Sequence, residues 1–193
     1  MTTPSTPAHS PTSPNAPRAD GALALFTPDG VPVRLDAFAG STLVVQLVRY
    51  FGCLPCQVYL RDLDGRADAL AAVGARAIAI GGSAHYQARW LRESGVAMPL
   101  LLDPPGLFRD WAGLGDLGRR QMLALRGIRN YLSAVAGGVR PRRPTVDVMR
   151  SPGIVILDAD LALRWAHEGT ALGDYPPPDR VLREAAAVSG TSV

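Results

Sequence analysis

The sequence predicts an α/β fold in which a mixed central sheet carries helices on both faces. Aliphatic runs alternate with helical patterns through most of the chain, and a hairpin follows near its end. The strands expected to be buried are Thr42–Val48, Ala75–Ile80, Met98–Leu102 and Gly153–Leu157. Right-handed crossovers make the first three of them parallel, and the closing hairpin adds antiparallel edge strands.

The first elements are a hairpin, a strand and an interrupted helix. Two short apolar segments, Leu23–Phe26 and Val31–Leu35, flank the turn residues Thr27–Gly30. After the strand at Thr42–Val48, apolar residues recur at helical spacing from Pro55 to Gly74. Gly65 lies inside this helix, and we expect a kink there.

The later elements complete both faces of the sheet. Ala162–His167 is expected to pair with the preceding strand across the turn Asp158-Ala159-Asp160. The remaining helices are expected at Tyr86–Ser94, Leu107–Ala112 and Asp179–Val188, with Ser83 as a possible N-cap of the first.

Three segments differ in composition. Residues 1–20 are rich in Pro, Ser and Thr without apolar periodicity, so we expect a disordered tail before a domain at 22–190. Residues 113–148 are predicted to be an insertion with a basic helix and loop. Its helical stripe comprises Leu117, Gln121, Leu125, Ile128, Leu132 and Val135, and its loop carries Arg140, Arg142 and Arg143.

Charge and hydropathy exclude several classes of protein. The 193 residues carry 20 basic and 17 acidic side chains, and a net charge of +3 does not suggest a nucleic-acid-binding protein. No apolar run approaches the roughly 20 residues that cross a bilayer. The first residues do not resemble a secretory signal, so a cytoplasmic protein is expected.

In a reducing compartment, two cysteines three residues apart favour redox chemistry or metal binding over a structural disulfide.

Cys53 and Cys56 fall where the first buried strand meets its helix. Unpaired amides and the helix dipole at such an N-terminus stabilise a thiolate, and cysteines one turn apart can form a disulfide with little backbone movement. The alternatives are a zinc half-site or two inert thiols. A structural zinc needs four ligands, and the sequence has no other cysteine, so no metal is expected. Arg49 could lower a thiol pKa or hold an anionic substrate; alternatively, it points to solvent.

The order of strands and helices around this motif is thioredoxin-like. Pro152 directly precedes the strand at Gly153–Leu157. In thioredoxin-like proteins a cis-proline at this place packs against the cysteine motif and keeps the substrate groove open, so the resemblance implies a substrate-binding role for Pro152. The alternative is an ordinary proline at a strand start.

The segment Val45–Cys56 resembles the strand-to-helix signature of peroxiredoxin-like proteins of the AhpC/TSA superfamily. Its Arg-x-Phe-Gly-Cys-x-x-Cys pattern is similar to the subgroup that includes prostamide/prostaglandin F synthase. Ala75–Gly81 and the Leu102-Asp103-Pro104 turn also resemble that subgroup. The resemblance implies a thiol-dependent oxidoreductase with no bound cofactor, reduced by a partner such as thioredoxin or glutathione.

The motif departs from typical peroxiredoxins, which carry Pro-x-x-x-Thr-x-x-Cys. In this chain the peroxidatic cysteine falls on Cys56, the threonine on Cys53 and the proline on Arg49. A thioredoxin-type role would instead make Cys53 the nucleophile and Cys56 the resolving thiol. Because the start of a helix exposes the first cysteine more than the second, the sequence favours Cys53.

Three functions remain open at this point. The first is a peroxiredoxin-like antioxidant or oxidoreductase that acts on a peroxide or disulfide through Cys53 and Cys56. The second is a reductase of a lipid-like endoperoxide, which needs an apolar pocket beside Cys53. The third is a non-catalytic interaction module that uses the arginine-rich insertion.

Overall fold

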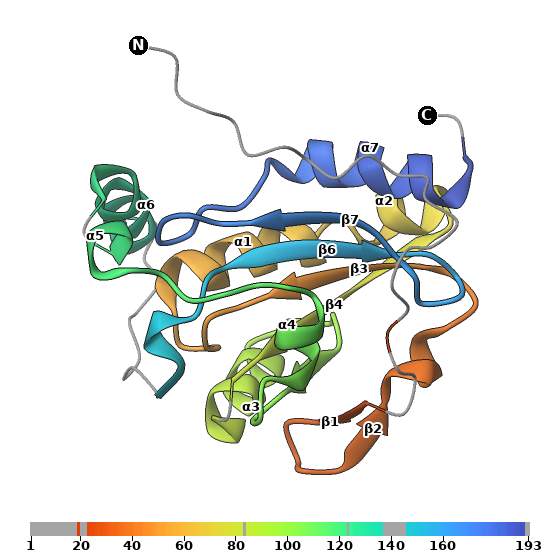
Figure 1. Ribbon diagram of the computed structural model, residues 1–193, viewed down its shortest axis with the longest axis horizontal. Helices are drawn as coiled ribbons and strands as arrows, with labels where there is room; N and C mark the ends of the chain where they lie inside the picture. The colour runs from red at the N-terminus through yellow and green to blue at the C-terminus, as the bar shows by residue number, and fades with distance from the viewer. Residues whose placement is uncertain (1–18, 20–22, 83, 123, 137–145, 192–193) are drawn as a thin grey trace.

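A seven-stranded sheet with the order β2-β1-β5-β4-β3-β6-β7 forms the centre of the molecule (Figure 1). The computed structural model describes residues 19, 23–82, 84–122, 124–136 and 146–191. The strands are β1 (Ala24–Phe26), β2 (Pro32–Arg34), β3 (Thr42–Leu47), β4 (Ala75–Gly81), β5 (Leu100–Leu102), β6 (Gly153–Leu157) and β7 (Leu163–Glu168).

Strand directions agree with the prediction. β3, β4 and β5 are parallel, whereas β1–β2 and β6–β7 are antiparallel hairpins. β6 pairs antiparallel with β3, with Gly153 opposite Leu47. β6 therefore lies inside the sheet, and of the closing hairpin only β7 is an edge strand, where the sequence suggested two.

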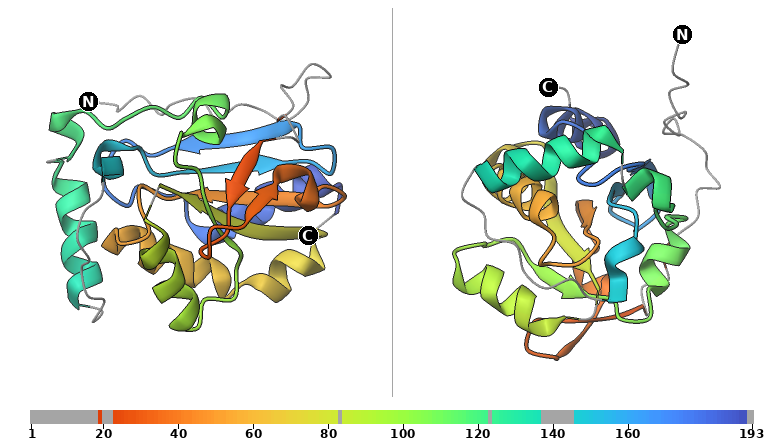
Figure 2. Two further views of the ribbon diagram at one scale, coloured as in Figure 1. Left: turned by 90° about the horizontal axis from the view of Figure 1, so that it is seen from below. Right: turned by 90° about the vertical axis from the view of Figure 1, so that its left-hand side faces the viewer.

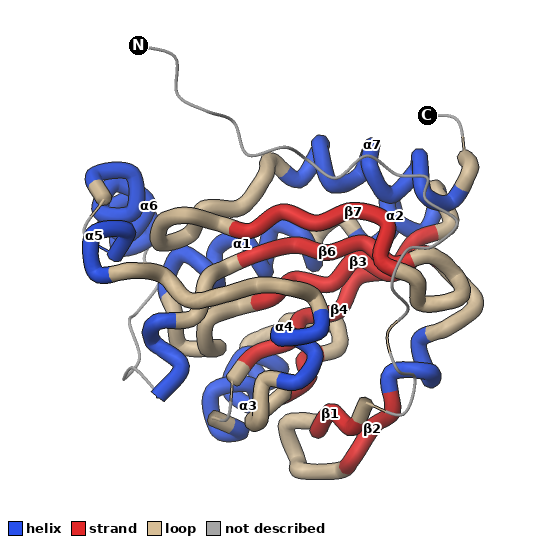
Figure 3. Tube along the Cα trace, in the orientation of Figure 1, coloured by secondary structure: helices blue, strands red, loops and turns tan. Residues whose placement is uncertain are grey.

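Helices cover both faces of this sheet (Figure 3). The long helix expected after the first buried strand is divided around Gly65, as its glycine predicted. The helical elements are η1 (Leu35–Phe38), α1 (Leu54–Asp64), α2 (Ala67–Ala72), α3 (His85–Glu93), α4 (Leu107–Trp111), α5 (Arg119–Met122), α6 (Leu125–Ala136), η2 (Val146–Met149) and α7 (Pro178–Ser189).

Two apolar cores result from the alternation of side chains along the strands. On β3, Val44 points into the core shared with α1, α2, α3 and α7, whereas Leu43 and Val45 point into the core beneath α4 and η1. Figure 2 shows the two layers on either side of the strands. Every residue of β3 is buried, as expected for a strand covered on both faces.

The insertion differs from its prediction in one respect. The single expected stripe is divided between two helices, α5 and α6, and Leu117 lies before both, buried in the domain. Residues 137–145, with the basic loop, and Ser83 lie outside the described residues. So does the tail, apart from Ala19, whose amide donates a hydrogen bond to the Leu161 carbonyl. No helix within the described ranges is long and apolar enough to cross a membrane.

Candidate active site

The two cysteines lie at the end of β3, where the chain turns into α1. Cys53 has extended backbone angles and is the N-cap residue, and its carbonyl accepts the Gln57 amide at 2.9 Å. Pro55 occupies the first turn, where its missing N–H costs nothing because first-turn amides have no partner within the helix. Cys56 follows in that turn, so both sulfurs lie at the positive end of the helix dipole.

Both thiols are buried. Cys53 is 2% exposed and Cys56 is 1% exposed, so the greater exposure expected for Cys53 is not found. Both cysteines are free thiols in the structure, and the Cys53 thiol donates a hydrogen bond to the Cys56 sulfur. The pair is therefore within reach of disulfide formation, while neither sulfur is open to bulk solvent.

The surroundings of the two sulfurs shift the pKa values of Cys53 and Cys56 in opposite directions. Burial raises the pKa of Cys53 well above its usual value, and its hydrogen bond to Cys56 raises it further. Burial acts against the Cys56 thiolate too. Hydrogen bonds from Cys53, from the Tyr175 hydroxyl and from the Arg49 backbone amide outweigh it and lower the pKa of Cys56 to about 7. Of the two thiols, Cys56 is therefore the more acidic.

Arg49 contacts the cysteine pair and does not point to solvent. Its side chain is buried, with Nη1 3.9 Å from Cys53 Sγ. Its charge lowers the pKa of both thiols, and its guanidinium lies 5.8 Å from the centre of the Tyr50 ring. Burial and the neighbouring thiols raise the pKa of Tyr50 to about 12, and Tyr131 of α6 adds to the rise.

Tyr175, which the sequence analysis did not identify, approaches the same sulfur from the segment after β7. Its hydroxyl donates to the Leu47 carbonyl at 3.2 Å and also lies within hydrogen-bonding distance of Cys56 Sγ. Burial raises the pKa of Tyr175 well above its usual value, so this phenol stays protonated and acts as a donor. Tyr175 is far from the cysteines along the chain, and no local motif marked it.

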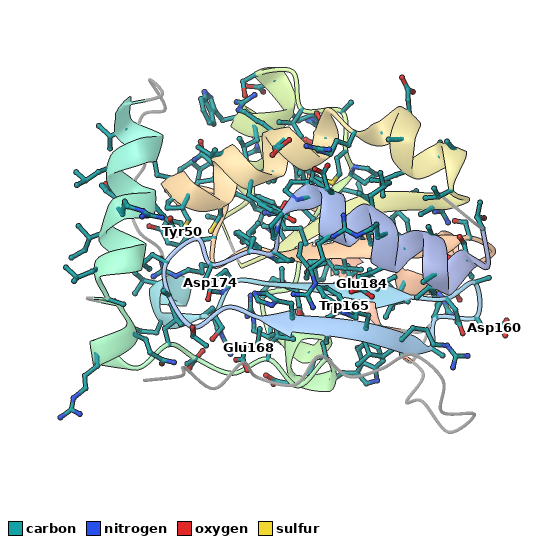
Figure 4. All side chains as sticks on the ribbon, turned by 90° about the horizontal axis from the view of Figure 1, so that it is seen from above. Tyr50, Asp160, Trp165, Glu168, Asp174 and Glu184 are labelled. Carbon is teal, nitrogen blue, oxygen red and sulfur yellow. The ribbon has the colours of Figure 1, made fainter. Side chains whose placement is uncertain are left out.

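Gly173 allows this segment to approach the cysteine motif. Its φ is +65°, and a Cβ there would press on Pro55 and lie 3.5 Å from the Asn130 Cβ. Only glycine meets both requirements without strain. In Figure 4 the loop with Asp174 passes close to Tyr50 and the start of α1.

Buried amide side chains hold the backbone on both sides of the cysteines. Gln46 Nε2 donates to the Cys56 carbonyl at 3.2 Å, and Gln57 Nε2 donates to the Phe51 carbonyl at 2.9 Å. Gln87 of α3 accepts the Gly52 amide at 2.8 Å. These bonds satisfy backbone groups that leave the regular strand before the helix begins, and so fix the positions of the sulfurs.

A second arginine, Arg109 of α4, lies behind the site. Nη2 donates to the Val48 carbonyl at 3.0 Å and Nη1 to the Ser151 carbonyl at 2.5 Å, so this buried side chain joins the ends of β3 and β6. Beside it is a polar cavity of about 10 Å³, lined in part by Arg49, Asp103 and Arg150. This space suits one water molecule.

Pro152 does not have the expected geometry. Peptide bonds throughout the described residues are trans, so the prediction of a cis-proline is wrong. Gly153 pairs with Leu47, which places Pro152 at the same edge of the sheet as the cysteines, and its carbonyl accepts the Gly169 amide at 2.7 Å. Pro152 directly precedes β6 and does so in the trans form. Its substrate-binding role stays a prediction that rests on position alone.

Solved structures with the same fold include peroxiredoxins. Peroxiredoxin Q from Xanthomonas campestris superimposes with a TM-score of 0.59 at 16% identity, covering 91% of this chain and 97% of that one. The peroxidoxin BcpB from Mycobacterium tuberculosis gives a TM-score of 0.59 at 18% identity, covering 93% and 99%. A secreted M. tuberculosis disulfide oxidoreductase homologous to E. coli DsbE gives 0.52 at 14% identity, covering 86% and 96%. These likenesses confirm the thioredoxin-like fold.

The sequence comparison agrees at the level of the family. No curated protein sequence shows significant similarity to this chain. The resemblance to the prostamide/prostaglandin F synthase subgroup stays a prediction. The AhpC/TSA family model matches residues 15–128, which is more than half of the chain and includes both cysteines. The protein therefore belongs to the AhpC/TSA family.

Proposed function

We propose that this protein reduces hydroperoxides, with Cys56 as the peroxidatic cysteine and Cys53 as the resolving cysteine. The observation that carries the proposal is the set of three donors around Cys56 Sγ, which lowers the pKa of this buried thiol to about 7. A thiolate is the form that attacks a peroxide. The comparison with the usual Pro-x-x-x-Thr-x-x-Cys motif supports the same assignment, because its cysteine falls on Cys56.

The proposed cycle passes one electron pair through the two sulfurs. The Cys56 thiolate attacks the terminal oxygen of a hydroperoxide, forming a sulfenic acid while the O–O bond breaks and the alkoxide takes a proton to leave as an alcohol. The Cys53 thiol then displaces water from the sulfenic sulfur and forms the Cys53–Cys56 disulfide. A dithiol partner, or two molecules of a thiol such as glutathione, reduces this disulfide. The cycle needs no bound organic cofactor or metal.

Arg49 is the substrate-binding residue of this proposal. Its buried guanidinium lies beside Cys53 Sγ and next to the thiolate, where a positive charge also favours the alkoxide formed when the O–O bond breaks. It replaces the proline of the usual motif, so the peroxide pocket differs from that of typical peroxiredoxins. A thioredoxin- or glutathione-like reductant implies a reducing compartment, and we propose the cytoplasm.

The two other functions have less support. An endoperoxide reductase needs an apolar pocket beside Cys53, whereas the cavity described at this end of the sheet is water-sized, and its lining includes Arg49, Asp103 and Arg150. A purely structural interaction module gives no reason for three hydrogen bonds to one cysteine sulfur.

The assignment is tested with single-cysteine variants. Reduced Cys53→Ser protein, treated with one equivalent of hydrogen peroxide, is expected to form a sulfenic acid at Cys56 but to stop after one turnover. Cys56→Ser is expected to lose peroxide reduction by on the order of a thousandfold or more, as removal of an enzyme's nucleophile generally does. Mass spectrometry with a sulfenic-acid probe reads the first result, and peroxide consumption reads the second.

Two controls make the outcome decisive. Far-ultraviolet circular dichroism of both variants checks that each is folded, and reaction of the wild type with a small disulfide measures thioredoxin-type exchange. If the sulfenic acid forms at Cys53 in the Cys56→Ser protein and not at Cys56 in its counterpart, the roles are reversed. If the folded wild type exchanges with disulfides but ignores peroxide, the peroxidase proposal fails.

A further inference from the structure

The outer face of α6 carries large apolar side chains that no other part of the described structure covers. Leu125 is 85% exposed and Leu132 is 61% exposed. Ile128, Tyr131 and Val135 are also exposed, and together with Leu125 and Leu132 they form the α6 stripe. Their spacing of three or four residues places them on one side of the helix. Such a contiguous apolar surface indicates an interaction site.

The helix is attached to the domain by a different side. Asn130 Nδ2 donates to the carbonyls of Leu172 and Gly173, at 2.9 and 3.3 Å. Gly127 packs so closely that a Cβ there would lie 3.0 Å from the Leu172 backbone nitrogen. These contacts fix the rotation of α6, so that the α6 stripe faces away from the sheet. In Figure 2 the helix stands at one end of the molecule beside α1.

Positive charge accompanies the stripe. From Leu117 to Ala136 the sequence contains four arginines and no acidic residue. Of these, Arg120 and Arg129 have exposed side chains. A second copy of α6 packed on the first would bring like charges together, whereas an anionic surface would complement them. An exposed apolar stripe on an arginine-bearing helix is the pattern of helices that lie at a membrane interface.

The middle of the stripe lies near the thiol site. Asn130 contacts Gly173, which lies against Pro55 of the cysteine motif. Tyr131 of the stripe lies within electrostatic range of Tyr50, and Tyr50 stands beside the two thiols. Figure 4 shows Tyr50 where α6 meets the start of α1. A surface that binds the α6 stripe therefore lies close to the thiol site.

We propose that α6 binds the surface of an anionic lipid bilayer, with the α6 stripe among the acyl chains and Arg129 at the lipid phosphates. The binding itself does not depend on peroxide chemistry. Together with the proposed function, it makes hydroperoxides of membrane lipids the substrates closest to Cys56.

The test is co-sedimentation of the full chain with vesicles of phosphatidylcholine, with and without phosphatidylglycerol. Binding is expected only to the vesicles that contain phosphatidylglycerol, and to weaken as salt is raised. Leu132→Glu is expected to weaken the binding by about tenfold or more, because it removes a leucine that membrane contact would bury and adds a negative charge. Arg129→Gln is expected to weaken it several-fold.

The matched control is Val31→Glu, which adds the same charge at another exposed apolar residue, in the β1–β2 turn. It is expected to bind as the wild type does. Cys56→Ser is also expected to bind normally, so a failure of the peroxidase proposal would not be mistaken for a failure of membrane binding. The proposal is overturned if the wild type does not bind anionic vesicles, or if Leu132→Glu and Val31→Glu bind equally. It is also overturned if ultracentrifugation shows that the α6 stripe is buried in a dimer that Leu132→Glu dissociates.

Discussion

The start of α1 and the outer face of α6 are neighbours in space but have opposite character. At α1 the side chains are buried, and Cys56 Sγ receives three hydrogen bonds. On α6 the large side chains are exposed apolar groups, and Gly127 and Asn130 contact the domain from another side of the helix. A reactive thiolate needs fixed donors around it, whereas a contact surface must stay uncovered. The proposed chemistry and the proposed membrane contact therefore belong to two different regions of the molecule.

The largest effect on stability is expected in the core under α1. Leu60 is fully buried among the side chains between α1 and the sheet. Leu60→Ala removes this packing and leaves a cavity, so the free energy of unfolding should fall by about 2–5 kcal/mol. Urea denaturation followed by circular dichroism measures the change. A loss below that range would show that the core between α1 and the sheet is less tightly packed than its burial indicates.

Gly173→Ala tests the link between the two regions. The positive φ and the contact with Pro55 should together cost about 1–3 kcal/mol in the free energy of unfolding. Gly113→Ala is the matched control, because Gly113 has a φ of +73° but nothing within 4 Å of its added Cβ. The difference between the two losses in the free energy of unfolding measures the contribution of the contact with the cysteine motif. Equal losses would show that the contact contributes nothing.

Tyr175→Phe tests the electrostatics of the thiolate. Removing one donor to Cys56 Sγ should raise its pKa from about 7 by roughly one unit, equivalent to about 1.4 kcal/mol. Because the thiolate fraction rises with pH, alkylation of Cys56 should accelerate as pH increases through this pKa and then level off, and in the variant the curve should shift to higher pH. The rate of iodoacetamide labelling in a Cys53→Ser background, compared with Cys53→Ser alone, measures the shift.

Tyr59→Phe is the control for that substitution. The Tyr59 ring stacks on Tyr175 with centroids 4.4 Å apart, and its buried hydroxyl has no hydrogen-bond partner among the described residues. Removing the Tyr59 hydroxyl should not change the pH at which the labelling of Cys56 accelerates. If both variants shift the curve equally, packing of the two rings sets the acidity of Cys56, and the Tyr175 hydroxyl does not.

The smallest effect on stability is expected on α6. Leu132→Gln changes a side chain that is 61% exposed, so the free energy of unfolding should change by less than about 0.5 kcal/mol. Thermal melting of the variant beside Leu60→Ala compares the two regions directly. A large loss from Leu132→Gln would mean that the α6 stripe is packed in solution, for example against a second copy.

The sequence by itself determined the order of the elements and the place of the cysteines. Aliphatic runs such as Thr42–Val48 and breaks such as Gly65 are local signals, because burial on two faces and helix interruption depend on adjacent residues. The position of Cys53 and Cys56 between a strand and a helix followed from the same signals. The expectation of a cis Pro152 did not follow from local signals. It came from a resemblance, and the structure has a trans bond at this position.

Only the tertiary structure decided which sulfur is the more acidic and what surrounds it. Tyr175 and Arg109 reach the site from segments far along the chain, and Cys53 is buried where the sequence favoured exposure. The outward direction of the α6 stripe likewise depends on where Gly127 and Asn130 contact the domain. Periodicity identifies an apolar face of a helix, but long-range packing decides whether that face is buried and which donors surround a given thiol.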